Sequence, residues 1–200
     1  MLVSKQVILM IYSQSKSFPI WFFVLVSLSL FCFCTKVDEK NQLAQQLKNI
    51  DNFITRDTSN AKGQNRDTII TVTNKRETSR IVWNPGDSDT LAVGDTVAFA
   101  YIGRLFTAGK GNIFSTNLPE VISSGAWPTS IFPEDYGKNA VGVGYYLPGL
   151  DAGLLGMRAG EYAYIIFTSQ YGYGNKELST IPKMSSLMFE VEIKYIIKKR

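Results

Sequence analysis

The chain has 200 residues, of which 45% are hydrophobic and 19% are charged, and its formal net charge is +4. It contains no histidine, and its two cysteines, Cys32 and Cys34, both lie near the N-terminus, which excludes Ser-His-Asp and Cys-His catalytic groups, imidazole-bound metals and disulfides or zinc sites in the remainder. The function classes that remain rely on shape, hydrogen bonds and desolvation, on carboxylates, or on binding alone.

The first predicted element is a targeting segment over residues 1–33. Lys5 and Lys16 precede an apolar run at residues 18–33 that no charge interrupts. A basic region followed by an apolar core is the layout of a secretory signal, and the 16 residues of this run are fewer than the roughly 20 that a membrane-spanning helix needs. A cysteine at the end of such a run resembles a bacterial lipoprotein signal, which predicts lipidation at Cys34.

Two alternatives remain for this segment, namely lipidation at Cys32 or an uncleaved anchor helix with incidental cysteines. Each of them attaches the chain to a membrane and places the rest outside the cytoplasm. We therefore expect an exported, membrane-anchored protein of the bacterial cell envelope, facing the periplasm or the cell surface. Removal of residues 1–33, which hold two lysines and no acid, would lower the net charge from +4 to +2, so we expect no nucleic-acid partner.

Residues 34–66 are predicted to hold the lipidation site, a short helix and a linker. Between residues 38 and 54, apolar side chains recur every three or four residues, which is the pattern of an amphipathic helix. These side chains are Leu43, Leu47, Ile50, Phe53 and Ile54. The apolar stripe could dock on the main domain or on a second copy of the chain, so self-association through residues 38–54 is left open. The polar residues 55–66 indicate a linker.

Residues 67–200 are predicted to form one domain that consists mainly of strands. β-Branched and aromatic residues are concentrated at 68–73, 81–83, 96–106 and 161–168. The clearest strand has one apolar face and one charged face. The apolar face holds Leu187, Phe189, Val191, Ile193 and Tyr195, and the charged face holds Glu190, Glu192 and Lys194. Alternation of this one-sided kind predicts an antiparallel sheet.

A single short helix is predicted within this domain, beginning near Pro148 and ending at Ala159-Gly160. Leu150, Leu154 and Met157 share one face of it. Glycines at 153 and 156 indicate the close approach of a neighbouring backbone. The predicted fold is therefore α+β, with an antiparallel β-sheet wrapped around one short α-helix, preceded by the signal or anchor segment and a short N-terminal helix.

Two blocks of the domain resemble the FKBP family of peptidyl-prolyl cis-trans isomerases. The first block, VGDTVAFAYIGRL at residues 93–105, is followed by IFSTN at 113–117. The second block begins with YLPGLDAGLLGMRAGE at residues 146–161. It continues with YGYG at 171–174, IP at 181–182 and LMFEVE at 187–192. Together these motifs are similar to the family pattern, in the family's order, over most of residues 91–196.

This resemblance implies an FKBP-like fold and rotamase activity on proline peptide bonds in protein folding, with neither a cofactor nor a metal. The matching catalytic positions are Tyr101, Phe114, Ser115, Leu147, Tyr173 and Phe189. The matching substrate-binding positions are Tyr146, Leu150 and Ile181. In the family the N–H at the position of Leu147 holds the ligand carbonyl, and the hydroxyl at that of Tyr173 binds a neighbouring carbonyl. The implied partners are proline-containing protein segments, and a lipid anchor would add the membrane.

Three departures from the family pattern bear on activity. Ser115 stands where the family usually has Asp, so we expect either reduced activity or binding without turnover. Leu150 replaces a frequent Trp, and an insertion at residues 118–144 either packs on itself or rims the pocket. The alternatives to an isomerase are therefore a non-catalytic proline-peptide-binding or chaperone module, or a structural lipoprotein of an envelope or motility complex.

Overall fold

A computed structural model describes residues 20–63, 71–75, 78–87, 89–124, 139–142 and 144–200. The chain divides into two units, residues 1–41 and 42–200, and helix α2 (Ile20–Gly63) runs through the boundary between them. Residues 20–33 of the predicted targeting segment are thus helical, and its first 19 residues lie outside the described part. Among the residues that are described, no helix is both long enough and apolar enough to cross a membrane.

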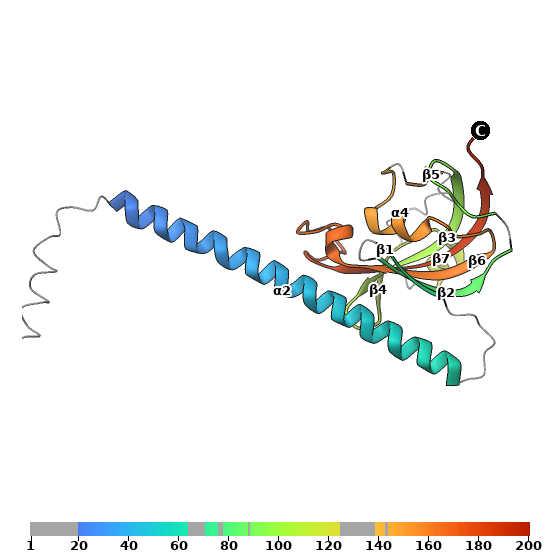
Figure 1. The fold of residues 1–200 in the computed structure, drawn as a ribbon, viewed down its shortest axis with the longest axis horizontal. Helices are drawn as coiled ribbons and strands as arrows, with labels where there is room; N and C mark the ends of the chain where they lie inside the picture. The colour runs from blue at the N-terminus through green and yellow to red at the C-terminus, as the bar shows by residue number, and fades with distance from the viewer. Residues whose placement is uncertain (1–19, 64–70, 76–77, 88, 125–138, 143) are drawn as a thin grey trace, which may run out of the picture. The chain divides into compact units, whose positions relative to one another are not determined.

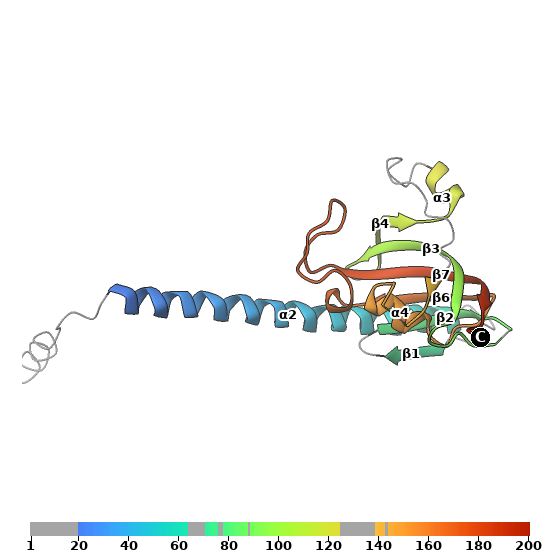
Figure 2. The same ribbon diagram turned by 90° about the horizontal axis from the view of Figure 1, so that it is seen from above.

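One antiparallel sheet organises the second unit (Figures 1 and 2). Its strands are β1 (Thr71–Lys75), β2 (Thr78–Pro85), β3 (Thr96–Phe106), β4 (Lys110–Thr116), β5 (Asn139–Ala140), β6 (Glu161–Phe167) and β7 (Ser186–Ile197). The strand order is β1-β2-β6-β7-β3-β4, with β5 paired to β3, and each pair is antiparallel. The antiparallel sheet predicted from the one-sided alternation is therefore confirmed.

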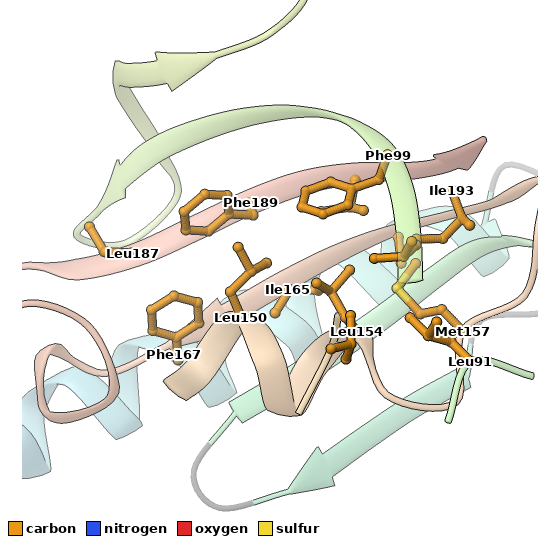
Figure 3. Close-up of a cluster of buried hydrophobic side chains, with 14 of the residues drawn as sticks. Leu91, Phe99, Leu150, Leu154, Met157, Ile165, Phe167, Leu187, Phe189 and Ile193 are labelled. Atoms are coloured by element: carbon orange, nitrogen blue, oxygen red, sulfur yellow. The ribbon is translucent and has the colours of Figure 1, made fainter. Parts of the chain in front are cut away.

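The short helix α4 (Pro148–Leu154) packs its apolar residues on one face of this sheet (Figure 3). Two glycines one turn apart let it approach β6. A Cβ atom added at Gly149 would lie 2.2 Å from Cγ of Phe167, and one added at Gly153 would lie 2.2 Å from Cγ2 of Ile165. The close approach predicted at Gly153 is therefore present, but the neighbour is a side chain rather than a backbone. At Gly156 the prediction is wrong, because among the described residues no neighbouring atom comes within 4 Å of an added Cβ atom.

Helix α4 ends earlier than predicted, at Leu154 instead of at Ala159-Gly160. Gly156 adopts a φ of +80°, in the left-handed region where glycine is favoured just past a helix end. The guanidinium group of Arg80 donates hydrogen bonds to the carbonyls of Gly153 (2.9 Å) and Leu155 (3.0 Å). A positive charge on the last carbonyls complements the helix dipole and stabilises this end.

The C-terminal part of helix α2 packs on the opposite face of the sheet. Ile50 and Phe53 are 2% and 3% exposed and belong to a second apolar cluster. Its other buried members are Ile81, Phe106, Ile166 and Met188, which alternate along their strands with residues that face α4. The apolar stripe of the helix thus docks on the chain's own domain. Self-association through residues 38–54 stays a prediction, with two residues of the stripe already buried.

Residues 55–63 were predicted as part of a linker but belong to helix α2, and residues 64–66 lie outside the described part. Arg56 in this last stretch donates a hydrogen bond to the carbonyl of Ala108 (3.4 Å), in the turn between β3 and β4. Contacts of this kind use polar side chains, so they leave no apolar periodicity in the sequence. The linker prediction is therefore wrong for residues 55–63.

A network of charged groups surrounds Glu190 on the same outer face of the sheet. Its carboxylate accepts hydrogen bonds from Arg104 (2.6 Å), Lys110 (2.7 Å) and the hydroxyl of Tyr162 (3.2 Å). Burial alone would raise the pKa of Glu190, but the two cations outweigh it, so this pKa lies below its ordinary value. The strand pattern therefore assigned Glu190 to the correct face, although the side chain is buried there.

Asp95, in the turn before β3, holds the C-terminal end of the chain. Its carboxylate accepts hydrogen bonds from Nζ of Lys198 (2.6 Å) and from the backbone N–H groups of Lys199 (2.9 Å) and Ala92 (2.9 Å). The bond from Lys198, followed by those two N–H groups, lowers the pKa of Asp95 from 3.8 to about 2. Because the folded-state pKa is the lower one, the stabilisation is present above about pH 4 and is lost as the pH falls toward 2.

Asp95→Asn is therefore expected to lower the free energy of unfolding by about 1–2 kcal/mol near pH 7, and by progressively less as the pH falls through about 4. A protonated Asp95 has lost the charge that strengthens these bonds. The free energy of unfolding of the wild-type protein therefore approaches that of the variant in acid. Urea unfolding at several pH values measures the difference. Asp87→Asn, at an exposed position in the same segment, is the control, and a difference that does not change with pH would contradict the prediction.

Candidate functional site

Eight of the nine side chains predicted to form the site belong to or pack against the apolar cluster between α4 and the sheet, in which Figure 3 labels Leu150 and Phe189. Four of them are buried in it, namely Phe114, Leu150, Ile181 and Phe189. Four more are half-buried and pack against it, namely Tyr101, Tyr146, Leu147 and Tyr173. They come from β3, β4, β7, the start of α4 and the segment between β6 and β7. The structure thus brings the set together, and the role of each residue stays a prediction.

Phe189 on β7 lies at the centre of the aromatic side chains. Its ring meets that of Phe114 edge-on at 5.6 Å between centroids, stacks with Phe167 at 5.8 Å and is tilted toward Tyr101 at 5.9 Å. Edge-on and offset pairs of this kind are the favoured aromatic geometries. Gly103 on β3 makes room for them, because a Cβ atom there would lie 2.9 Å from Cζ of Phe114 and 3.2 Å from Cε1 of Phe189. The result is a closely packed aromatic wall.

A pair of hydroxyl groups lies at the margin of this wall. The hydroxyl oxygens of Tyr101 and Ser115 are 2.8 Å apart, and either can be the donor. The pairing of β3 with β4 brings them together, since Ser115 lies opposite Gly103 in the register. Both groups are neutral, so this hydrogen bond lacks the extra strength that a carboxylate at position 115 would give it. This is the local consequence of a serine at position 115.

Asn117, which sequence reasoning did not identify, fixes the backbone around Tyr101. Its Oδ1 accepts a hydrogen bond from the Tyr101 N–H (2.8 Å), and its Nδ2 donates one to the carbonyl of Phe99 (2.9 Å). The hydroxyl of Thr116 donates to the carbonyl of Tyr101 (2.7 Å). These bonds lie beside an irregularity in the pairing of β3 with β7, between Ala98 and Phe99. A single buried amide carries no periodic signal, and the available signal was the position of Asn117 at the end of the IFSTN segment.

Two further aromatic residues, Phe99 and Phe167, extend the wall and were not assigned to the site. The ring of Phe99 meets Tyr146 edge-on at 5.5 Å and lies 5.8 Å from Tyr101. In the sequence both phenylalanines look like inward-facing strand residues, which is typical of ordinary core. The available signal was the two-residue spacing of Phe99 and Tyr101, which places them on one face of the strand.

The start of α4 presents the backbone of Leu147 at the edge of the cluster. Leu147 is the N-cap residue with φ −54° and ψ 140°, and Pro148 follows in the first turn. The carbonyl of Leu147 accepts a hydrogen bond from the Asp151 N–H (2.9 Å), whereas within the described part of the chain its own N–H donates none. The Asp151 carboxylate also accepts hydrogen bonds from the N–H groups of Gly142 (3.0 Å) and Gly144 (3.2 Å). These bonds connect the segment before α4 to the helix.

The segment between β6 and β7 carries Tyr173 and Ile181. It begins with the 3-10 helix η1 (Ser169–Tyr171) and contains an isolated antiparallel bridge between Leu178 and Ile181. The predicted insertion is described only at its ends, by helix α3 (Pro119–Ser123) and strand β5, because residues 125–138 lie outside the described part. Whether this insertion rims the site therefore stays a prediction.

The chemistry that this arrangement can perform is desolvation combined with neutral hydrogen bonding. Apolar and aromatic side chains form its walls, and hydroxyl and backbone N–H groups lie at its margin. Within the described ranges, no three Cys, Asp or Glu side chains are grouped as metal ligands would be. Such a surface can bind an apolar ring and surround the amide bond beside it.

Comparison with known proteins identifies relatives of this domain. A family model for FKBP-type peptidyl-prolyl cis-trans isomerases matches residues 88–194. FK506-binding protein 1 of Aspergillus oryzae is 31% identical over 110 residues, which cover 54% of this chain and 88% of that protein. FK506-binding protein 2 of Aspergillus fumigatus is 32% identical over 105 residues, covering 50% of this chain and 63% of that protein.

Solved structures show the same fold. The three FKBP domains of wheat FKBP73 superpose with a TM-score of 0.52 at 19% identity, over 65% of this chain and 50% of that one. A multi-domain immunophilin from Arabidopsis thaliana gives a TM-score of 0.53 at 16% identity, over 68% and 48% of the two chains. The alignments thus span about half the length of these multidomain proteins, and the predicted FKBP-like fold is confirmed.

Proposed function

The chain belongs to the FKBP-type peptidyl-prolyl cis-trans isomerases and is an isomerase of that type, and from this premise we propose that the cluster around Phe189 rotates X-Pro bonds of exported proteins. The observation that carries the proposal is the convergence of the side chains on one aromatic cluster, with neutral hydrogen-bonding groups at its margin. That combination suits an amide that must lose its polar character in order to rotate.

The proposed mechanism lowers the barrier by desolvation. Rotation about a peptide bond has a barrier of about 18–20 kcal/mol, because the planar amide is stabilised by resonance. In the twisted transition state this resonance is lost, the amide is less polar, and a dry apolar surrounding favours it over either planar form. The rings of Phe114, Phe189 and Tyr101 would supply that surrounding. A tenfold acceleration requires only about 1.4 kcal/mol of preferential binding to the twisted form.

The polar groups at the margin would orient the substrate. The N–H of Leu147 would donate a hydrogen bond to a carbonyl of the bound segment, and the hydroxyl of Tyr173 would donate to a neighbouring carbonyl. The geometry at the start of α4 supports the first role, because the Leu147 N–H donates no hydrogen bond within the described residues. The Tyr101–Ser115 pair would hold the tyrosine ring in a fixed orientation.

A refolding assay tests the proposal. The full-length chain, purified in mild detergent, is added at micromolar concentration to a protein whose refolding is limited by X-Pro isomerisation, which takes tens to hundreds of seconds uncatalysed. We expect the slow phase to accelerate, and we expect Tyr173→Phe, which removes one hydroxyl, to retain only part of the acceleration. No acceleration by the wild-type chain would refute the enzymatic proposal.

A second candidate, a proline-peptide-binding or chaperone module without turnover, is favoured by one observation, the neutral Ser115 hydroxyl beside Tyr101. Ser115→Asp discriminates between the two. If the natural protein turns over, we expect the rate constant to rise by no more than about tenfold, since one hydrogen bond to a charged group contributes about 1.5 kcal/mol more than a neutral one. A far larger rise at unchanged affinity for a proline peptide would favour the binding module.

The proposed location of this activity is outside the cytoplasm, at a bacterial membrane. The supports are the two lysines that precede the uninterrupted apolar run and the cysteine that ends it. Mass spectrometry of the N-terminus of the purified protein tests this. A diacylglycerol on Cys34 would support the lipoprotein, a lipid on Cys32 would move the anchor by two residues, and an intact N-terminus would indicate an uncleaved anchor.

A further inference from the structure

We propose that Gln46 on helix α2 is a positioning residue for Tyr173, so that the docked N-terminal helix forms part of the working site. The helix lies outside residues 88–194, the region that matches the family. The predicted effect on catalysis rests on the proposed function, whereas the predicted effect on the loop does not.

Four hydrogen bonds form a closed ring between the helix and the base of the segment that carries Tyr173. Nε2 of Gln46 donates to the carbonyl of Met184 (2.7 Å), and the Met184 N–H donates to the carbonyl of Gly174 (2.9 Å). The Gly174 N–H donates to the carbonyl of Ser169 (2.8 Å), and the Ser169 N–H donates to Oε1 of Gln46 (2.8 Å). Both polar atoms of the Gln46 side chain are thus used on this one loop.

The ring controls the position of Tyr173 because Gly174 is its immediate neighbour in the chain. Met184, at the other end of the loop, has a φ of 55°, and among the described residues it alone adopts a positive φ without being glycine. Such a conformation is unfavourable for a bulky residue and persists only where surrounding contacts hold it. The N–H and carbonyl of Met184 are both held in the ring, so removal of Gln46 frees one side of a strained segment.

Gln46 can act as a fixed anchor because the helix is held on the sheet independently of it. Ile50 and Phe53 are buried in the outer apolar cluster, and Asn49 donates a hydrogen bond to the carbonyl of Thr107 (2.7 Å), in the turn between β3 and β4. Loss of the Gln46 side chain should therefore loosen the loop without releasing the helix. A variant of Gln46 therefore tests the positioning of the loop separately from the docking of the helix on the sheet.

The experiment uses the full-length chain in detergent and compares Gln46→Met with the wild type. Methionine matches glutamine in length and helix propensity but forms neither hydrogen bond. We expect faster hydrogen exchange at Ser169 and Gly174, and a fall of about fivefold in kcat/KM for a proline tetrapeptide, carried mainly by a higher KM. Gln46→Glu, which keeps the acceptor for the Ser169 N–H but loses the donor, should restore part of the exchange protection.

Asn49→Ala is the matched control, because it removes a helix-to-domain hydrogen bond that does not reach the loop. We expect its kcat/KM to equal that of the wild type. Wild-type exchange and kinetics in Gln46→Met would overturn the proposal, and so would an equal loss in Asn49→Ala, since Gln46 would then act only by docking the helix. If the wild-type chain proves inactive, the proposed function fails, and the exchange rates at Ser169 and Gly174 still decide the positioning role.

Discussion

Replacing Gly149 with alanine is expected to lower the free energy of unfolding by about 3 kcal/mol, the upper part of the range for overpacking a core. The new Cβ atom would lie 2.2 Å from Cγ of Phe167, a ring that is fully buried and stacked on Phe189. Neither ring can retreat without disturbing the aromatic wall. The higher helix propensity of alanine, about 1 kcal/mol over glycine, offsets only part of this effect.

Urea unfolding followed by circular dichroism measures the change, with Gly109→Ala as the matched control. The nearest atom to a Cβ at Gly109 is Nη2 of Arg56 at 3.7 Å, an ordinary contact, so we expect a change of at most about 0.5 kcal/mol there. Because Leu147 immediately precedes α4, any displacement of the helix should also weaken peptide binding. Wild-type stability of Gly149→Ala would show that α4 can shift away from β6 at no cost.

The second large effect is expected at the outer face of the sheet, where Phe53→Ala should lower the free energy of unfolding by about 3–4 kcal/mol. Phe53 is 3% exposed, and its ring meets that of Phe106 edge-on at 5.3 Å. Truncation removes this contact and leaves a cavity between helix and sheet. The measurement is urea unfolding together with limited proteolysis of residues 42–63, which should be cut faster in the variant.

Asn52→Ala is the control for this prediction, because Asn52 is the exposed neighbour of Phe53 on the same helix. A change confined to about 0.5 kcal/mol is expected there. One outcome is that Phe53→Ala has the same free energy of unfolding as the control while residues 42–63 are cut more readily. In that case α2 does not contribute to the stability of the domain. A full loss of stability would instead make residues 42–63 an integral part of the domain.

The strand pattern predicted the inner face of the sheet well, because one side of each strand packs on a single helix. Tyr195 shows where the pattern fails. Simple alternation puts it on the inner face with Ile193, yet it is 39% exposed. The pairing of β7 with β3 shifts at this point, since Ala98 lies opposite Tyr195 and Phe99 lies opposite Ile193. An extra residue in one strand reverses which side chains face inward beyond that point. Hydrophobic periodicity does not reveal the position of such a bulge.

The outer face could not be predicted from strand patterns, because its cover comes from another part of the chain. Ile166 and Met188 are fully buried, although they alternate with the inward-facing residues. The helical stripe that covers them was visible in the sequence, but its partner was not. Hydrophobic periodicity shows that a face is buried and leaves open which surface buries it.

The candidate site was predictable from motifs only for residues that a family pattern includes. Tyr101, Phe114 and Phe189 fall on such positions, and the structure brings them together. Gln46 lies outside these motifs, and Asn117 ends the IFSTN segment at residues 113–117 but was not assigned to the site. Each is a single polar side chain that binds backbone groups distant in sequence, and contacts of that kind follow from the tertiary structure alone.

The position of β7 in the sheet sets the order in which the domain can fold. The strand nearest the C-terminus lies between β6 and β3, so it supplies one long edge to each half of the sheet. Until residues 186–197 have left the ribosome, β3 and β6 present unpaired backbone edges that invite pairing with other chains. The sheet therefore closes only after β7 has been synthesised, so the two halves of the domain cannot complete folding while the chain is still growing.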